Sequence, residues 1–121
     1  MPDRIGDDPA ASYRRAAAAL VAAYSGPGVL DGTVAMPWGA TPAPFALNMI
    51  MADHATHAWD LTRATGLTIE ISDTTAETAL ATSQATISPE FRAAGLYDPE
   101  QPPTADATAL DRLAAYSGRR L

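Results

Sequence analysis

The chain has 121 residues, of which 47% are hydrophobic and 18% are charged, and its formal net charge is −6. This length and composition predict a single folded domain over residues 1–121 and exclude a disordered chain. The chain contains no cysteine, and all 8 basic residues are arginine. It therefore offers no disulfide, thiolate nucleophile, cysteine-bound metal or Schiff-base lysine. The negative charge argues against nucleic acid as a partner.

Hydropathy predicts a protein outside the membrane. No stretch approaches about 18 consecutive apolar residues, the length that spans a bilayer. Residues Met1 to Pro9 are acidic and lack the apolar core of a signal peptide. We therefore expect a cytoplasmic protein with no membrane partner.

Alanine accounts for 27 residues of the chain. Alanine favours helix, but each alanine buries little apolar area, and buried area is what stabilises a core. The composition therefore predicts an all-α protein with a modest core, which would gain stability by associating with another chain.

The first predicted element is a helix over residues 9–24. Asp8 is suited to cap this helix, Pro9 suits its first position, and apolar residues recur along it with helical spacing. The sequence Gly26-Pro27-Gly28 ends it.

Residues 25–44 form the least regular part of the sequence, with four prolines and four glycines. The alternation within Val29–Met36 is weak, so we expect an ordered loop in preference to a short strand. Residues 36–39 resemble a turn with a buried aromatic, Trp38.

The remaining predicted elements are helices joined by connectors. A helix over residues 44–65 begins among prolines and ends at Gly66. The β-prone run LTIEI at 67–71 is short and isolated, which favours an extended connector. Three more helices are expected: 73–87 with Ser72 or Asp73 as its cap, 89–94 with Ser88 as its cap, and 106–117 after a loop over 97–105.

The helix over 44–65 contains the residues best suited to chemistry. Asp53, His57 and Asp60 follow the i, i+4, i+7 spacing of one helix face. A carboxylate and an imidazole one turn apart are suited to binding a divalent metal, or to forming a histidine general base oriented by an aspartate. The same spacing occurs in ordinary surface pairs, but the apolar residues around it predict a buried pair. The second histidine, His54, is rotated by about 100° from Asp53 and so points elsewhere.

Several other residues have structural interpretations. The Met49–Met51 cluster is typical of a core, and Trp38 and Trp59 of packing anchors whose indole N–H groups need acceptors. Asp60 is expected to cap a loop or to pair with an arginine, and Arg119-Arg120 to be solvated charges at a helix end. No serine lies in a nucleophile-elbow pattern.

The run DHATHAWDLTRATG from Asp53 to Gly66 resembles the D-x-x-x-H-x-W-D-L-x-R-A-T-G segment of DinB-like metal-binding proteins. This group is related to the N-terminal domain of mycothiol-dependent maleylpyruvate isomerase. Downstream, Ile87–Arg92 and Gly95–Pro99 are similar to the family's R…G-F-x-P stretch, and Asp106–Arg120 is similar to its terminal D-R-L-x-A-F-x-G-R. The resemblance covers residues 8–121.

The resemblance implies a partial helical bundle of three to four helices and a divalent metal, zinc or nickel, held by three residues. Asp53 and His57 match two of these ligands. The third is a histidine in a W-x-V-x-x-L-x-x-H segment on an earlier helix, and this sequence has no such segment. We therefore expect a homodimer whose copies complete each other. The alternatives are a partner chain that supplies the missing helices, or a short form without the metal.

Two functions follow from these observations. The first is thiol-dependent isomerase or transferase chemistry with Asp53 and His57 as metal ligands and His54 or His57 as the catalytic group. Because the chain has no cysteine, the thiol would be external, such as mycothiol. The alternative is a metal-free small-molecule binding protein, cofactorless catalyst or assembly module, with an apolar pocket lined by Met49, Trp59, Trp38 and Tyr97.

Overall fold

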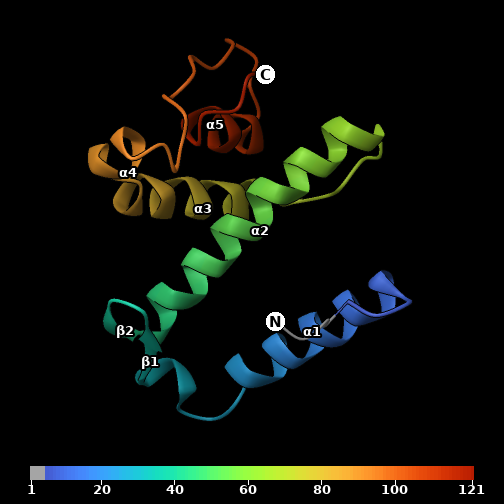
Figure 1. The fold of residues 1–121 in the computed structure, drawn as a ribbon, viewed down its shortest axis with the longest axis vertical. Coiled ribbons are helices and arrows are strands. Elements are labelled where there is room, and N and C mark those ends of the chain that lie inside the picture. The colour runs from blue at the N-terminus through green and yellow to red at the C-terminus, as the bar shows by residue number, and fades with distance from the viewer. Residues whose placement is uncertain (1–4) are drawn as a thin grey trace. The chain divides into compact units, whose positions relative to one another are not determined.

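The structure is a computed structural model that describes residues 5–121. The first four residues of the acidic Met1–Pro9 segment, which we expect not to be a signal peptide, lie outside the described residues. The described part of the chain is mostly helical, as expected, and also contains one small two-stranded sheet (Figure 1).

The chain divides into two compact units, one ending at Pro44 and the other running from Phe45 to Leu121. The first contains α1 (Pro9–Tyr24), the short 3₁₀ helix η1 (Val29–Asp31), and strands β1 (Thr33–Met36) and β2 (Gly39–Pro42). The second contains most of α2 (Ala43–Thr65), followed by α3 (Asp73–Thr86), α4 (Pro89–Ala93) and α5 (Ala109–Tyr116). That residues 1–121 fold as one domain stays a prediction.

The bounds of α1 confirm the sequence prediction. The Asp8 carboxylate accepts a hydrogen bond from the backbone N–H of Ala11 at 2.9 Å, and Pro9 occupies the first helical position. This is the arrangement that satisfies the free N–H groups at a helix start. In its own unit, α1 packs against η1.

The prediction of an ordered loop over residues 25–44 is wrong in part, because β1 and β2 form an antiparallel hairpin there. Thr33 pairs with Pro42, and Met36 pairs with Gly39. Gly39 has a φ of +122°, a value that glycine adopts without strain. The two strands are only four residues long, which is too short for their alternation to stand out in the sequence.

The expectation that Trp38 is a buried aromatic is also wrong. Trp38 lies at the tip of the hairpin and is 64% exposed. Its indole Nε1 donates to the Thr41 hydroxyl at 3.2 Å. The indole N–H therefore has its acceptor within the hairpin, although the ring is not buried.

Most of the predicted helix ends of the second unit are confirmed. Gly66, with a φ of +71°, follows the last residue of α2. Residues 67–71 form no helix or strand. Ser72, not Asp73, caps α3, since its hydroxyl accepts from the N–H of Thr75 at 3.2 Å. Ser88 caps α4 in the same way.

The last helix begins later than the predicted residue 106. Thr108 caps α5, and its side chain and that of Asp111 each bond to the other residue's backbone. The Asp111 carboxylate also accepts a hydrogen bond from the Trp59 indole at 2.9 Å. The capping box of Thr108 and Asp111 and the bond from Trp59 both fix the start of α5 at this position. The preceding residues form a turn, in which the Ala107 N–H donates to the Thr104 oxygen.

The core of the second unit is made of small side chains, as the alanine content predicted. Three alanines and Leu113 form the buried cluster, with α2 contributing Ala52 and Ala55 and α3 contributing Ala79. Leu113 on α5 is the largest fully buried side chain in the described part of the chain. Figure 1 shows α3 next to α5, and these two helices share the most extensive helix–helix contact.

Among residues 5–121, no helix is both long enough and apolar enough to cross a membrane.

Candidate functional site

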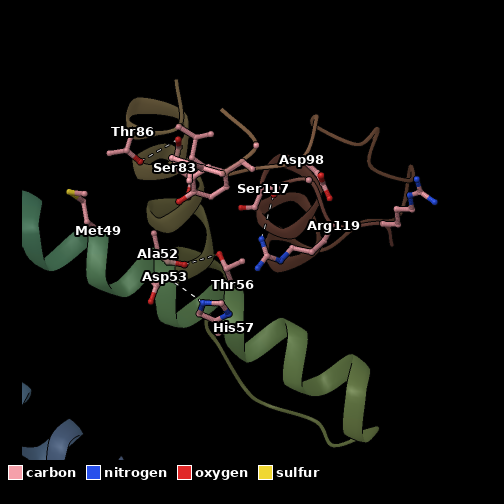
Figure 2. Close-up of a pocket in the computed structure, with 16 residues that line it drawn as sticks. Met49, Ala52, Asp53, Thr56, His57, Ser83, Thr86, Asp98, Ser117 and Arg119 are labelled. Atoms are coloured by element: carbon pink, nitrogen blue, oxygen red, sulfur yellow. Dashed lines mark hydrogen bonds and ion pairs between the residues drawn. The ribbon is translucent and has the colours of Figure 1, made fainter. Parts of the chain in front are cut away.

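The second unit contains a cavity of about 820 Å³, a volume within the usual range for small-molecule sites. Its wall combines one face of α2, the last turn of α3, and the two loops that precede and follow α5 (Figure 2). The lining residues are Met49, Ala52, Asp53, Thr56, His57, Ser83, Thr86, Ile87, Gly95, Leu96, Tyr97, Asp98, Ser117, Gly118, Arg119 and Arg120.

His57 lies between two carboxylates of its own helix. Its Nε2 is 3.5 Å from the Asp53 Oδ1, and its Nδ1 is 3.1 Å from the Asp60 Oδ2. Residues three and four apart on a helix share a face, so the predicted stripe of α2 is confirmed as a geometric feature.

Asp60 is anchored in turn by Arg119, from the segment after α5. The guanidinium donates from Nε and from one terminal nitrogen to the two carboxylate oxygens, each at 2.9 Å. This bidentate pair is among the stronger hydrogen-bonded arrangements in proteins. Of the two roles predicted for Asp60, capping a loop or pairing with an arginine, the structure shows the arginine pair. The expectation that Arg119 is a solvated charge is wrong.

The same contacts shift the ionisation of both partners. The hydrogen bonds from Arg119 hold the pKa of the Asp60 carboxyl below its ordinary value, against the opposing effect of partial burial, and His57 adds to the lowering. The hydrogen bond to Asp60 raises the pKa of the Arg119 guanidinium. Asp60 is therefore ionised at neutral pH and acts only as a hydrogen-bond acceptor.

The Asp53–His57 pair is not buried, contrary to the expectation from its apolar surroundings. The side chains of His57 and Asp53 are 62% and 66% exposed. The neighbouring alanines Ala52 and Ala55 are buried and belong to the core cluster, and Ala52 also lines the cavity. The pair instead lines a cavity that is open to solvent, where water can solvate its polar groups.

The other residues predicted to form a site lie in different parts of the structure and do not line one pocket. Of the four residues predicted to line one apolar pocket, Met49 and Tyr97 line this cavity. Trp59 instead lines a separate, shallower depression with Arg63, and the guanidinium of Arg63 lies 4.9 Å from the centre of its ring. Trp38 belongs to the hairpin of the first unit.

His54 is not among the cavity residues. Its side chain is exposed, and its Nδ1 lies 2.9 Å from the backbone oxygen of Ile50, one turn earlier on α2. A carbonyl oxygen can only accept, so this contact assigns a proton to Nδ1. The arrangement agrees with the expectation that His54 points away from Asp53.

The residues around His57 meet only part of what a metal centre requires. Asp53 and His57 offer an oxygen and a nitrogen close together on one face, which is a suitable pair of ligands. Within residues 5–121, no group of three or more histidines and acidic residues is arranged to hold a metal ion. Asp60 is already engaged by Arg119. The described residues therefore fit two ligand positions and do not complete a centre.

The sequence reasoning missed most of the cavity residues, and two of them, Arg119 and Ser83, matter most for the chemistry. Arg119 is 59 positions from Asp60, so no local pattern connects them. Ser83 lies among the threonines of α3 with no distinguishing neighbour. The one available signal was that an ionised Asp60 on a largely apolar helix needs a cationic partner.

Comparison with known proteins finds two relatives in Mycobacterium tuberculosis. They are "Uncharacterized protein MT0763" of strain CDC 1551 / Oshkosh and "Uncharacterized protein Rv0738" of strain ATCC 25618 / H37Rv. Each is 33% identical over 110 residues, or 90% of this chain, and the chain spans 60% of the length of each. No family model matches the chain, and no solved structure matches it. These likenesses assign no function.

Proposed function

We propose that the second unit binds a small molecule in the cavity and that His57 accepts a proton from it. The observation that carries this proposal is the hydrogen-bonded chain from Arg119 through Asp60 to His57. An ionised Asp60 can only accept, so its contact with Nδ1 assigns the ring proton of a neutral His57 to that nitrogen. Nε2 is then left as an acceptor, on a residue that lines the cavity.

The immediate neighbour of Nε2 supports a proton-accepting role. In its carboxylate form, Asp53 offers only acceptor oxygens at 3.5 Å from Nε2, so beside a neutral His57 two acceptors face each other. A weakly acidic hydroxyl or thiol of a bound molecule would supply the missing proton. Once that proton is transferred, the two flanking carboxylates would stabilise the imidazolium.

The tautomer of His57 is tested by nitrogen NMR on protein labelled with ¹⁵N-histidine. We expect His57 to carry its proton on Nδ1, and Asp60→Asn to shift its tautomer balance because a neutral amide no longer demands a donor. His54 is the internal control, since it also carries its proton on Nδ1 but contacts a backbone oxygen. A wild-type His57 protonated mainly on Nε2 would contradict the proposal.

Ligand binding is tested with 4-ethylphenol, a small molecule with one weakly acidic hydroxyl. Its addition should shift the NMR signals of cavity residues, and His57→Gln should weaken its binding severalfold. His54→Gln, on the same helix but outside the cavity, should leave binding unchanged. Shifts confined to residues outside the cavity, or equal effects of the two substitutions, would refute the role of His57.

The Asp53–His57 pair favours a second candidate, the metal-dependent and thiol-dependent chemistry implied by the DinB-like resemblance. Asp53 and His57 would be two ligands of zinc or nickel, and the others would come from a bound thiol or a second chain. Such a metal would lower the pKa of a bound thiol, such as mycothiol. The partial bundle, its completion by a second copy and the isomerase or transferase activity all belong to this candidate.

Metal binding is tested by calorimetric titration of the purified chain with Zn²⁺ and with Ni²⁺. The second candidate predicts one metal per chain, or per pair of chains, and loss of binding in both Asp53→Asn and His57→Gln. His54→Gln should bind as the wild type does. Binding equally weakened by His54→Gln would indicate a non-specific histidine site, and no binding at all would leave only the first candidate.

A further inference from the structure

One buried hydroxyl of the cavity wall, that of Ser83, makes no hydrogen bond within the described residues. Ser83 lies on α3, lines the cavity and is only 5% exposed. Its backbone oxygen accepts hydrogen bonds from the residues that follow, but its Oγ makes none within residues 5–121. Because this part of the chain contains no fully enclosed side-chain oxygen or nitrogen without a partner, the Ser83 Oγ keeps some accessible surface, and Ser83 is one of the residues that line the cavity.

The Ser83 hydroxyl differs in its hydrogen bonding from the other serine and threonine hydroxyls of the cavity wall. Thr56, Thr86 and Ser117 also line the cavity, and each donates to the backbone oxygen four residues earlier, at 2.8, 2.9 and 2.9 Å. These three hydroxyls have their donors engaged by the protein. The Ser83 hydroxyl can therefore donate to a ligand oxygen without giving up a hydrogen bond within the protein.

The surroundings of Ser83 select the kind of group that would bind it. Ala52 and Ile87, which line the same cavity, are buried and apolar. A ligand carboxylate directly against these apolar side chains would lose more solvation than one hydroxyl restores, and the cations of the cavity wall, Arg119 and Arg120, follow α5 and are not on α3. An uncharged carbonyl or hydroxyl oxygen loses much less on leaving water.

Ser83 and His57 come from different helices of the cavity wall, α3 and α2 (Figure 2). We infer that the ligand carries two polar groups, a weakly acidic hydroxyl or thiol at His57 and an uncharged carbonyl or hydroxyl oxygen at Ser83. This inference rests on the proposed function and adds to it a class of ligand. Met49 and Leu96 also line the cavity and offer apolar contacts to such a ligand.

The test uses matched probes that differ only in one oxygen. The 3- and 4-hydroxyacetophenones carry both a phenol and a ketone, whereas 3- and 4-ethylphenol lack the ketone. We expect Ser83→Ala to weaken binding of at least one ketone about three- to tenfold relative to its ethyl counterpart, the usual effect of one hydrogen bond. Thr78→Ala, which removes a hydroxyl of α3 that lies outside the cavity, should not change that ratio.

The possible outcomes separate the two proposals. If His57→Gln weakens all four probes but Ser83→Ala leaves both ketone-to-ethyl ratios unchanged, the role of Ser83 is refuted and the proposed function stands. If the wild type binds none of the probes, both are refuted. In the wild-type protein, nuclear Overhauser contacts between the acetyl methyl and the Ser83 β-protons provide a second test that requires no variant, and their absence from both bound ketones would refute the inference.

Discussion

Asp60 is the residue that connects the candidate site to the rest of the second unit. It accepts one hydrogen bond from His57 on its own helix and two from Arg119, which follows α5. The Arg119 contacts hold its pKa low, so Asp60 stays ionised and selects the tautomer of His57. The chemistry available at His57 is therefore set by a residue that does not itself line the cavity.

We expect Asp60→Asn to destabilise the protein in a pH-dependent way. Because the folded-state pKa of Asp60 lies below its ordinary value of 3.8, its contribution to stability is fully present above that value and is lost as the pH falls through the lower, folded-state pKa. Arg119 and Asp60 are 26% and 37% exposed, so solvent screening limits the difference at pH 7 to about 1 kcal/mol or less.

The measurement is the free energy of unfolding by urea, compared between wild type and Asp60→Asn at pH 7 and near pH 3. Asp53→Asn is the matched control, since it also removes one carboxylate from α2 but breaks no ion pair with an arginine. A difference between wild type and Asp60→Asn that stays constant over this pH range would contradict the assignment.

The start of α5 shows how one side chain can serve two elements. Asp111 completes the capping box with Thr108 and also accepts the Trp59 indole of α2. Burial raises the pKa of Asp111, but the hydrogen bonds from Trp59 and Thr108 outweigh it, so the net pKa lies below the ordinary value. The cap thereby joins α5 to α2, the helix that contains His57.

We expect Thr108→Ala to lower the stability of the second unit by about 1 kcal/mol, the usual effect of losing a helix cap. Thr104→Ala is the matched control, because only the backbone oxygen of Thr104 has a hydrogen bond in the structure, and that bond survives the substitution. Thermal unfolding by circular dichroism measures both variants. Equal losses would indicate that the helix begins at the earlier position.

For the molecule as a whole, the first unit provides little core of its own. None of the 16 residues of α1 is buried, and its Tyr13 and Val21 are 61% and 66% exposed. A helix of this length is marginal in water without packing on an apolar face. The homodimer whose copies complete each other stays a prediction, and the apolar residues of α1 are a place where a second copy would add burial.

Light scattering on the purified chain tests the dimer. We expect twice the mass of the single chain, and a shift toward the single-chain mass in Val21→Glu, because a charge on the covered face opposes association. Arg14→Glu, an exposed change on the same helix, should keep the wild-type mass. A single-chain mass at all concentrations would rule out the homodimer.

Local signals in the sequence predicted most of the helices. Asp8, Ser72 and Ser88 mark helix starts because each side chain bonds to a backbone N–H three residues later. Gly66 marks the end of α2 because its left-handed backbone suits glycine. The Asp53–His57–Asp60 face was also predictable from local sequence, because helical spacing alone brings these residues together.

Contacts between distant segments decided the rest. The pairing of Arg119 with Asp60, the bond from Trp59 that supports the start of α5, and the inclusion of Ser83 in the cavity wall all depend on how α2, α3 and α5 pack. A residue pattern describes the neighbours along one element, whereas burial and long-range pairing depend on which faces meet. For that reason the sequence predicted the pair on α2, and the packing of the helices determined its exposure, its arginine anchor and the cavity that it lines.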